Sequence, residues 1–329
     1  MRGLPRTLVA LLCTIGMLVA APSLAAAHPL IGIGDNNTEM FGDPSFLALG
    51  IKLVRYDVPW DALAHRGTLT ALTVWLDDAR ADGLTPLVSF DHVGISGNIR
   101  SLPSVASYSA AFRAFRRRFP WVTQFVTWDE VNYYSEATAF DPQRVAGYYL
   151  ALRHDCASCT VLAADLVDVP RDAGVPLATW AHEFIRYAHV QPEYWGLNNY
   201  VGANDLSTAS TRALLGAVRG KIWFAETGGI VSHRPRTPPP SARRARRAAT
   251  VDRFILDRLA RLSARIQRVY LYQWSVVSPK DSWDSALISY RGDPRPAYDV
   301  LASTLQAWGV APDCAISGLP PTCTEASIR

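Results

Sequence analysis

Short apolar runs alternate with amphipathic helical segments along almost the whole chain, and this alternation constrains the fold more than any other feature. Each run is short and ends in polar residues, as a buried parallel strand does. We predict such strands at residues 30–35, 51–60, 85–92, 124–130, 160–165, 194–200, 221–226 and 268–275. About eight strand-plus-helix units favour an α/β fold, a single-domain (β/α)8 TIM barrel, over an open sheet with fewer strands.

The segments between the strands have helical spacing and stop signals where helices should end. Gly83, Pro120 and Gly220 stand at three of these ends. We predict helices at residues 44–49, 69–82, 108–119, 142–154, 177–189 and 207–219, one that runs on to residue 262, and a last one that ends near residue 308. Residues 28–310 therefore form the barrel domain, somewhat longer than the roughly 250 residues of an ordinary barrel.

Residues 1–27 have the pattern of a secretory signal peptide. Two arginines precede an apolar run from Leu8 to Ala21, and three alanines then stand before His28. The apolar run is short for a bilayer span, although an uncleaved membrane anchor stays an alternative. We expect cleavage after Ala27, a secreted protein, and no stable membrane association after cleavage.

Four cysteines remain outside the predicted signal peptide. An even number in an exported protein suggests two disulfides, and of three possible pairings we favour Cys156 with Cys159 and Cys314 with Cys323. The second would pin residues 311–329 as a C-terminal extension. A redox role for the first pair would need a helix that opens directly at the motif, whereas this pair lies between a helical segment and a strand.

Charge and motifs give no support to several other functions. The net charge of +4 is small for 329 residues and gives no reason to expect a nucleic-acid partner. His182 and Glu183 do not make a zinc motif because Arg186 stands where a second His is required. We expect no metal, no cofactor and a monomer. The basic run at 232–247 either covers a cleft above the barrel or, as we favour, leads into a solvated helix face.

Two glutamates follow predicted strands at opposite points of the barrel. Glu130 ends the fourth strand and Glu226 ends the seventh. Active sites of barrels lie at the carboxyl ends of the strands, so both carboxyl groups are expected at one rim. Two carboxyl groups that flank a bond are what glycoside hydrolysis requires: one protonates the leaving oxygen, and the other attacks the anomeric carbon or activates water.

Two motifs then resemble a known family. Residues 128–132, W-D-E-V-N, are similar to the W-N-E-P-N signature after the fourth strand in the large clan of retaining (β/α)8-barrel glycosidases, and residues 223–228 resemble its seventh-strand nucleophile segment. The resemblance implies that Glu226 is the nucleophile and Glu130 the acid and base. The chain departs from the signature at Asp129, where the clan has Asn, and at Val131, where it has Pro.

The resemblance also implies roles for supporting residues. Arg55 would hold the nucleophile ionised, Tyr200 would donate a hydrogen bond to it, and Trp274 would form the floor beneath the sugar. A structural ion pair for Arg55 and a core position for Trp274 are the alternatives. Other substrate-binding candidates at strand ends are Asp57, Trp60, Asp91, His92, Asp129 and Asn132. For His92 a structural role at the rim is equally open.

The predicted substrate is a polysaccharide or oligosaccharide, with β-linkage suggested by the resemblance. Asp129 only accepts hydrogen bonds when ionised, whereas the Asn of the clan also donates near the sugar 2-hydroxyl. Two alternatives to hydrolysis therefore stay open: a catalytically weakened carbohydrate-binding barrel, and a transglycosylase. The sugar and the choice between endo and exo action depend on loop shape and are not predicted.

Overall fold

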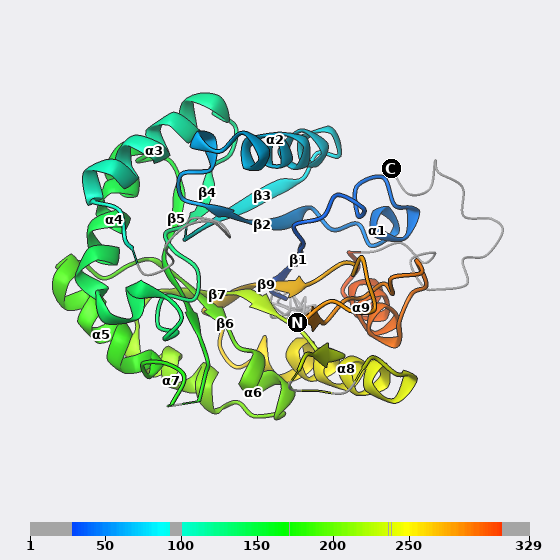
Figure 1. Ribbon diagram of the computed structural model, residues 1–329. Helices are drawn as coiled ribbons and strands as arrows, with labels where there is room; N and C mark the ends of the chain where they lie inside the picture. Colours follow the sequence, from blue (N-terminus) through cyan, green and yellow to red (C-terminus); the bar gives the residue numbers. More distant parts are fainter. Residues whose placement is uncertain (1–27, 93–100, 171, 236, 238, 311–329) are drawn as a thin grey trace, which may run out of the picture.

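The computed structural model describes residues 28–92, 101–170, 172–235, 237 and 239–310, and within them the strands close into a parallel barrel (Figure 1). The barrel order is β1-β2-β3-β4-β5-β6-β7-β9. The strands are β1 (Leu30–Gly34), β2 (Leu53–Pro59), β3 (Thr85–Asp91), β4 (Gln124–Val126), β5 (Thr160–Val167), β6 (Tyr194–Asn198), β7 (Lys221–Thr227) and β9 (Ile266–Tyr272). The predicted single-domain (β/α)8 barrel is confirmed. The predicted signal peptide (1–27) and C-terminal extension (311–329, with Cys314 and Cys323) lie outside the described residues.

Helices surround the barrel, and the predicted ones are present with small shifts of their ends. They are α1 (Pro44–Ala48), α2 (Arg66–Ala81), α3 (Val105–Arg118), α4 (Pro142–Asp155), α5 (Leu177–Ala188), α6 (Tyr200–Asn204), α7 (Ala209–Ala217), α8 (Ala242–Phe254) with the π-helical turn η3 (Ile255–Leu259), and α9 (Pro296–Ala307). Side chains of Ser104, Asp141 and Ser241 cap three of the N-termini. No helix among the described residues is both long and apolar enough to cross a membrane.

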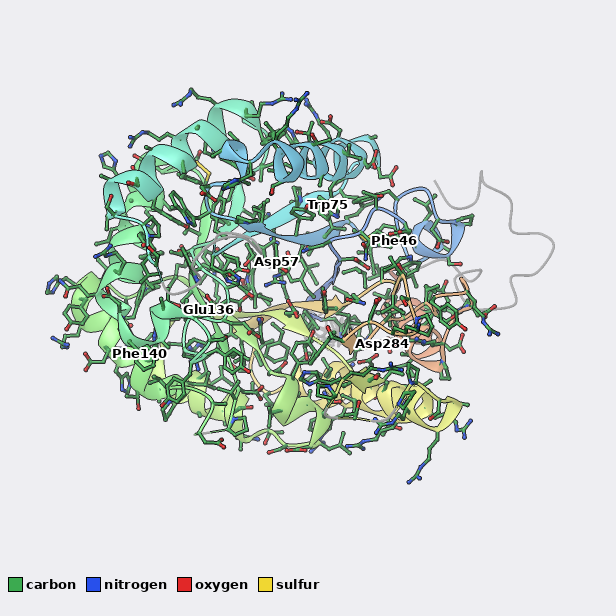
Figure 2. All side chains as sticks on the ribbon, in the orientation of Figure 1. Phe46, Asp57, Trp75, Glu136, Phe140 and Asp284 are labelled. Carbon is green, nitrogen blue, oxygen red and sulfur yellow. A yellow bond between two sulfur atoms is a disulfide. The ribbon has the colours of Figure 1, made fainter. Side chains whose placement is uncertain are left out.

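The core has two parts, one inside the barrel and one between the strands and the helices. Trp75 and Phe46, labelled in Figure 2, are buried in the outer part. The interior is filled by Leu53, Leu87, Val126, Leu162, Trp223, Ala225 and Tyr270. Gly32 leaves the space that Tyr270 fills, because a Cβ at Gly32 would stand 2.5 Å from the tyrosine ring. The barrel is therefore closed inside, and open space for a ligand lies at its rim.

The basic segment after β7 is only partly irregular. Its first part forms β8 (Ser232–His233), which pairs antiparallel with β10 (Trp283–Asp284). Most of its arginines lie in the first turns of α8, where Arg243 and Arg246 are exposed. This exposure fits the solvated helix face that we favoured.

Cys156 and Cys159 form a disulfide, with Cα atoms 5.4 Å apart, as predicted. Cys156 is the C-terminal cap of α4, and β5 begins at Thr160. A helix ends at the motif and none opens there, so the redox alternative has no structural support.

The loop that follows β7 lies directly against α8. Gly229 donates its N–H to the buried carboxylate of Asp252 at 2.7 Å. A Cβ on Gly229 would stand 2.2 Å from the carbonyl oxygen of Ala248 and 2.5 Å from its Cα. Backbone therefore touches backbone here, which fixes the end of the strand that carries Glu226.

We expect Gly229→Ala to lower the free energy of unfolding by about 1–3 kcal/mol, because neither backbone can move without disturbing β7 or α8. The measurement is urea unfolding. Gly216→Ala in α7 is the matched control: open space surrounds a Cβ there, and alanine raises helix propensity by up to about 1 kcal/mol. Equal effects of the two substitutions would contradict the close approach.

Candidate active site

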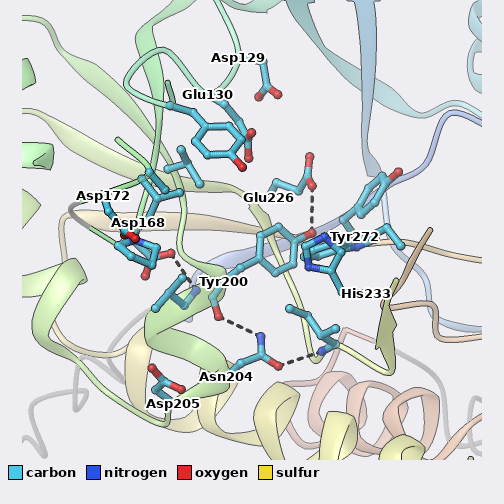
Figure 3. A pocket seen from close by; sticks show the side chains of 18 residues that line it. Asp129, Glu130, Asp168, Asp172, Tyr200, Asn204, Asp205, Glu226, His233 and Tyr272 are labelled. Atoms are coloured by element: carbon cyan, nitrogen blue, oxygen red, sulfur yellow. Dashed lines mark hydrogen bonds between the residues drawn. The ribbon is translucent and has the colours of Figure 1, made fainter. Parts of the chain in front are cut away.

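A pocket of about 780 Å³ opens at the carboxyl ends of the strands, and both predicted catalytic glutamates line it. Figure 3 shows the carboxyl groups of Glu130 and Glu226 on the same pocket, with Tyr200 and Tyr272 nearby. They come from the segments after β4 and at the end of β7. The barrel rim thus brings together two residues that are 96 positions apart in the sequence.

The backbone after β4 presents Glu130 to the pocket through bonds to both neighbouring strands. The N–H of Asp129 donates to the carbonyl of Phe90 at 2.8 Å, and the N–H of Val131 donates to that of Asp165 at 3.0 Å. Glu130 lies between them with φ of +40°, in the left-handed region that costs a non-glycine residue about 1–2 kcal/mol. The flanking bonds hold this strained conformation, as is common at functional sites.

Glu226 is held by two donors. Nη1 of Arg55 donates to its Oε2 at 2.5 Å, and the hydroxyl of Tyr200 donates to its Oε1 at 2.9 Å. Each carboxylate oxygen therefore has a donor, and one donor carries a positive charge. Arg55 and Tyr200 thus lie beside Glu226, where the resemblance implied them.

Arg55 binds four carboxylates at once. Its side chain is fully buried, and its two terminal nitrogens reach Asp57 at 2.7 Å, Asp129 at 2.7 Å, Asp165 at 3.2 Å and Glu226 at 2.5 Å. One guanidinium cannot balance four negative charges. Burial raises the pKa values of Asp57 and Asp165 well above their ordinary range against the opposing charge of Arg55, so protons can supply part of the balance.

The two glutamates have different environments. Burial raises the pKa of Glu130 well above its ordinary value, and the negative charges of Asp129 and Glu226 raise it further. Burial also raises the pKa of Glu226, but Arg55 and Tyr200 oppose that rise by binding its ionised form. The arrangement favours a protonated Glu130 beside an ionised Glu226, the distribution that an acid and a nucleophile need.

Tyr200 depends on a residue that the sequence did not indicate. We predicted a strand through residue 200, but β6 ends at Asn198 and Tyr200 begins the short helix α6. The buried carboxylate of Asp168 accepts from the N–H groups of Val201 at 2.9 Å and Gly202 at 2.7 Å. Asp168 follows β5, more than thirty residues earlier, so no local pattern predicts this cap. It holds α6 in the orientation that aims Tyr200 at Glu226.

Asp91 and His92 meet a third residue beside the pocket. Nδ1 of His92 is 2.6 Å from Asp91 and 3.2 Å from Glu136, which the sequence did not indicate. Among the described residues these three side chains could offer a metal ligand atoms within 4.8 Å of one another. Hydrogen bonds to Asp91 and Glu136 raise the pKa of His92 to about 10, as expected for an imidazole that lies between two carboxylates. The geometry favours an ion-pair cluster.

Two predicted substrate contacts are wrong. Trp274 lies two residues after the end of β9, is 1% exposed, and packs against Phe46 and Tyr298 in the core. Tyr272 lines the pocket instead. Asn132 is buried and joins the chain after β4 to the backbone of Val167 and Val175.

Asp57 and Trp60 do not line the pocket. Asp57 binds Arg55, and Trp60 packs beside Tyr108 with ring centroids 6.3 Å apart. Asp129, in contrast, lines the pocket.

The pocket also contains residues that sequence reasoning missed. They include Tyr133, Asp168, Asp172, Asp205, His233, Tyr272 and Trp283. His233 and Trp283 come from the β8–β10 pair, whose antiparallel register places them side by side.

Similarity to known proteins is visible in the fold alone. No protein-family model matches the chain, and no curated protein is similar to it in sequence. Xylanase B from Clostridium stercorarium F9 superposes with a TM-score of 0.61 at 12% identity, over 86% of this chain and 99% of that one. A glucosidase from Croceicoccus marinus gives 0.61 at 11% identity, over 86% and 68%.

A family 39 glycoside hydrolase from the gut symbiont Bacteroides cellulosilyticus WH2 superposes with a TM-score of 0.56 at 12% identity. The match covers 85% of this chain and 64% of that longer chain. At such low identity these similarities establish the fold and leave the activity to be argued from the site.

We expect Arg55→Ala to destabilise the protein by about 3–5 kcal/mol at pH 8, because it leaves buried carboxylates unpaired. The loss should be smaller at pH 5. Without Arg55, burial raises the pKa values of these carboxyl groups further, so protons can replace the guanidinium charge at pH 5. Carboxyl groups with a raised pKa in the folded state favour folding at low pH, and this contribution is lost as the pH rises. Denaturant unfolding at both pH values measures it.

Arg113→Ala is the matched control. Arg113 pairs with Asp155 at 3.2 Å, but its side chain is 51% exposed, so less than about 1 kcal/mol is expected at either pH. An equal loss of stability for Arg55→Ala at pH 5 and pH 8 would contradict the view that the guanidinium charge stabilises the ionised forms of the four carboxylates.

Proposed function

We propose that the protein is a glycoside hydrolase that cleaves O-glycosidic bonds by a retaining, double-displacement mechanism. The observation that carries the proposal is the pairing of Glu226, bound by Arg55 and Tyr200, with Glu130, whose pKa is raised, on one pocket. The shared fold with glycoside hydrolases supports it.

In the first step Glu226 attacks the anomeric carbon while Glu130 donates its proton to the glycosidic oxygen. The bond between carbon and leaving oxygen breaks, and an ester joins the sugar to Glu226. Arg55 and Tyr200 hold the attacking carboxylate ionised and oriented. Burial keeps Glu130 protonated until the leaving oxygen takes its proton.

In the second step Glu130, now ionised, takes a proton from water, and the water oxygen attacks the same carbon. Glu226 leaves as a carboxylate and the sugar keeps its original anomeric configuration. The ester of the intermediate is uncharged, which removes one of the negative charges that raise the pKa of Glu130. The proton affinity of Glu130 therefore falls when it must act as a base.

The proposed substrate is a β-linked polysaccharide or oligosaccharide. The pocket is open at the rim and lined by tyrosine and tryptophan rings, which suit the apolar faces of sugars. Two other functions use the same residues: a transglycosylase, in which a sugar replaces the water, and a binding protein that has lost turnover. Product analysis and calorimetry distinguish them from hydrolysis.

We expect Glu226→Gln to abolish hydrolysis of every substrate, because no nucleophile remains. Glu130→Gln should lose roughly 100-fold or more on natural glycosides but far less on dinitrophenyl glycosides, whose leaving group needs no proton. The measurement is steady-state kinetics on a panel of polysaccharides and aryl glycosides. The anomer formed first, followed by proton NMR, tests retention.

Glu183→Gln in α5 is the control, since the side chain of this glutamate is 46% exposed and lies outside the pocket. Equal sensitivity of Glu130→Gln to good and poor leaving groups would contradict the acid role. Binding of oligosaccharides without turnover in the wild-type protein would favour the binding protein.

We also propose that the protein is exported and cleaved after Ala27. The support is the pattern of residues 1–27. Expression of the full chain in a secreting host should give a mature product in the medium that begins at His28, as read by N-terminal sequencing. Retention of the uncleaved chain in the membrane fraction would favour the anchor alternative.

A further inference from the structure

The pocket is lined by an excess of carboxyl groups. They are Asp129, Glu130, Asp168, Asp172, Asp205 and Glu226, all labelled in Figure 3. Asp172 and Asp205 form no ion pair with any described residue. Arg55, buried beneath the pocket, is already shared by four carboxylates. Such a lining disfavours anionic sugars and favours a ligand that brings a positive charge.

Asp129 is the carboxylate whose place can be tied to the reacting atoms. Its Oδ1 accepts from Nη2 of Arg55 at 2.7 Å and from Nδ2 of Asn198 at 3.4 Å. Its Oδ2 has no hydrogen bond to a described residue, and the side chain is 17% exposed. One oxygen of Asp129 is thus held, and the other is available at the pocket.

The shared guanidinium places Asp129 beside the nucleophile. Glu226 binds Nη1 of Arg55 and Asp129 binds Nη2, so the two carboxylates lie next to each other. An oxygen of Glu226 must reach the anomeric carbon C1, whose ring neighbours are C2 and the ring oxygen. Oδ2 of Asp129 can only accept, and the ring oxygen has no proton to donate. Of the two groups next to C1, only a substituent on C2 can therefore donate a hydrogen bond to Asp129.

We propose that the site selects glycosides in which the sugar to be cleaved carries a protonated amine on C2, that is, a 2-amino-2-deoxy-hexoside with a free amino group. The inference rests on the proposed function and names its substrate class. A C2 hydroxyl could also donate to Asp129, but an ammonium group forms a charge-assisted bond and offsets the negative charge around Arg55. An N-acetyl group fills the same position without the charge.

The test compares aryl β-glycosides that differ only on C2: the free amine, the hydroxyl and the acetamide, each in the gluco and galacto series. We expect the wild-type kcat/KM to be at least about tenfold higher for the free amine, the difference between a charged and a neutral hydrogen bond. Asp129→Asn should abolish this preference. Its Oδ1 would stay with Arg55 and Asn198, so its Nδ2 would face the pocket, where it can donate to a hydroxyl but cannot accept from an ammonium. The preference should also weaken at alkaline pH as the amine loses its proton.

Asp257→Asn is the matched control, with the same charge change on an exposed residue of η3. Thermal melting of Asp129→Asn excludes misfolding as the cause. Calorimetry on Glu130→Gln measures binding independently of any turnover. It compares the affinity for chitosan oligosaccharides with the affinities for their N-acetylated and cellulose counterparts.

The outcomes separate the two proposals. Faster hydrolysis of the hydroxyl or acetamide glycosides, with an unchanged ratio in Asp129→Asn, overturns the amine inference and leaves the hydrolase standing. No hydrolysis, together with tighter binding of the cationic oligosaccharides, overturns the hydrolase and leaves the amine recognition standing. Neither hydrolysis nor preferential binding overturns both.

Discussion

The buried guanidinium of Arg55 is the interaction on which the site depends. It lies on β2 at the barrel mouth, and the carboxylates that it binds come from β2, the segment after β4, β5 and β7. A closed barrel is what allows strands so far apart in the chain to converge on one cation. Because the cluster is buried, each carboxylate must be balanced by Arg55, a proton or a ligand, and the charge of one member affects all the others.

Support for the two glutamates comes from residues that hold the backbone around the pocket. Asp168 caps α6 and so aims Tyr200, and Gly229 seats the loop after β7 on α8. The bonds that flank Glu130 hold a backbone conformation that the residue would not adopt alone. The chemistry thus rests on contacts between backbone and side chains of neighbouring elements, which is why it needs a rigid barrel.

Sequence periodicity was sufficient to predict the barrel. It also predicted the residues at strand ends, since the parallel arrangement places Glu130, Glu226 and Arg55 at one rim. It failed where tertiary contacts override the local pattern. Trp274 follows a strand as a platform residue would, but β9 ends two residues earlier and packing decides its burial. Asp168 and Glu136 act through partners more than thirty residues away, and no spacing encodes such pairs.

Asp129 links recognition to catalysis. Its negative charge raises the pKa values of both Glu130 and Glu226, so it favours the protonated acid but opposes the ionised nucleophile. A cation bound beside Asp129 would reduce both effects at the moment when Glu226 must attack. An uncharged sugar gives no such relief, and Arg55 and Tyr200 must then keep Glu226 ionised against the negative charge of Asp129. The charge of the sugar would then help to keep Glu226 ionised. Selectivity for the amine should therefore appear in kcat as well as in binding.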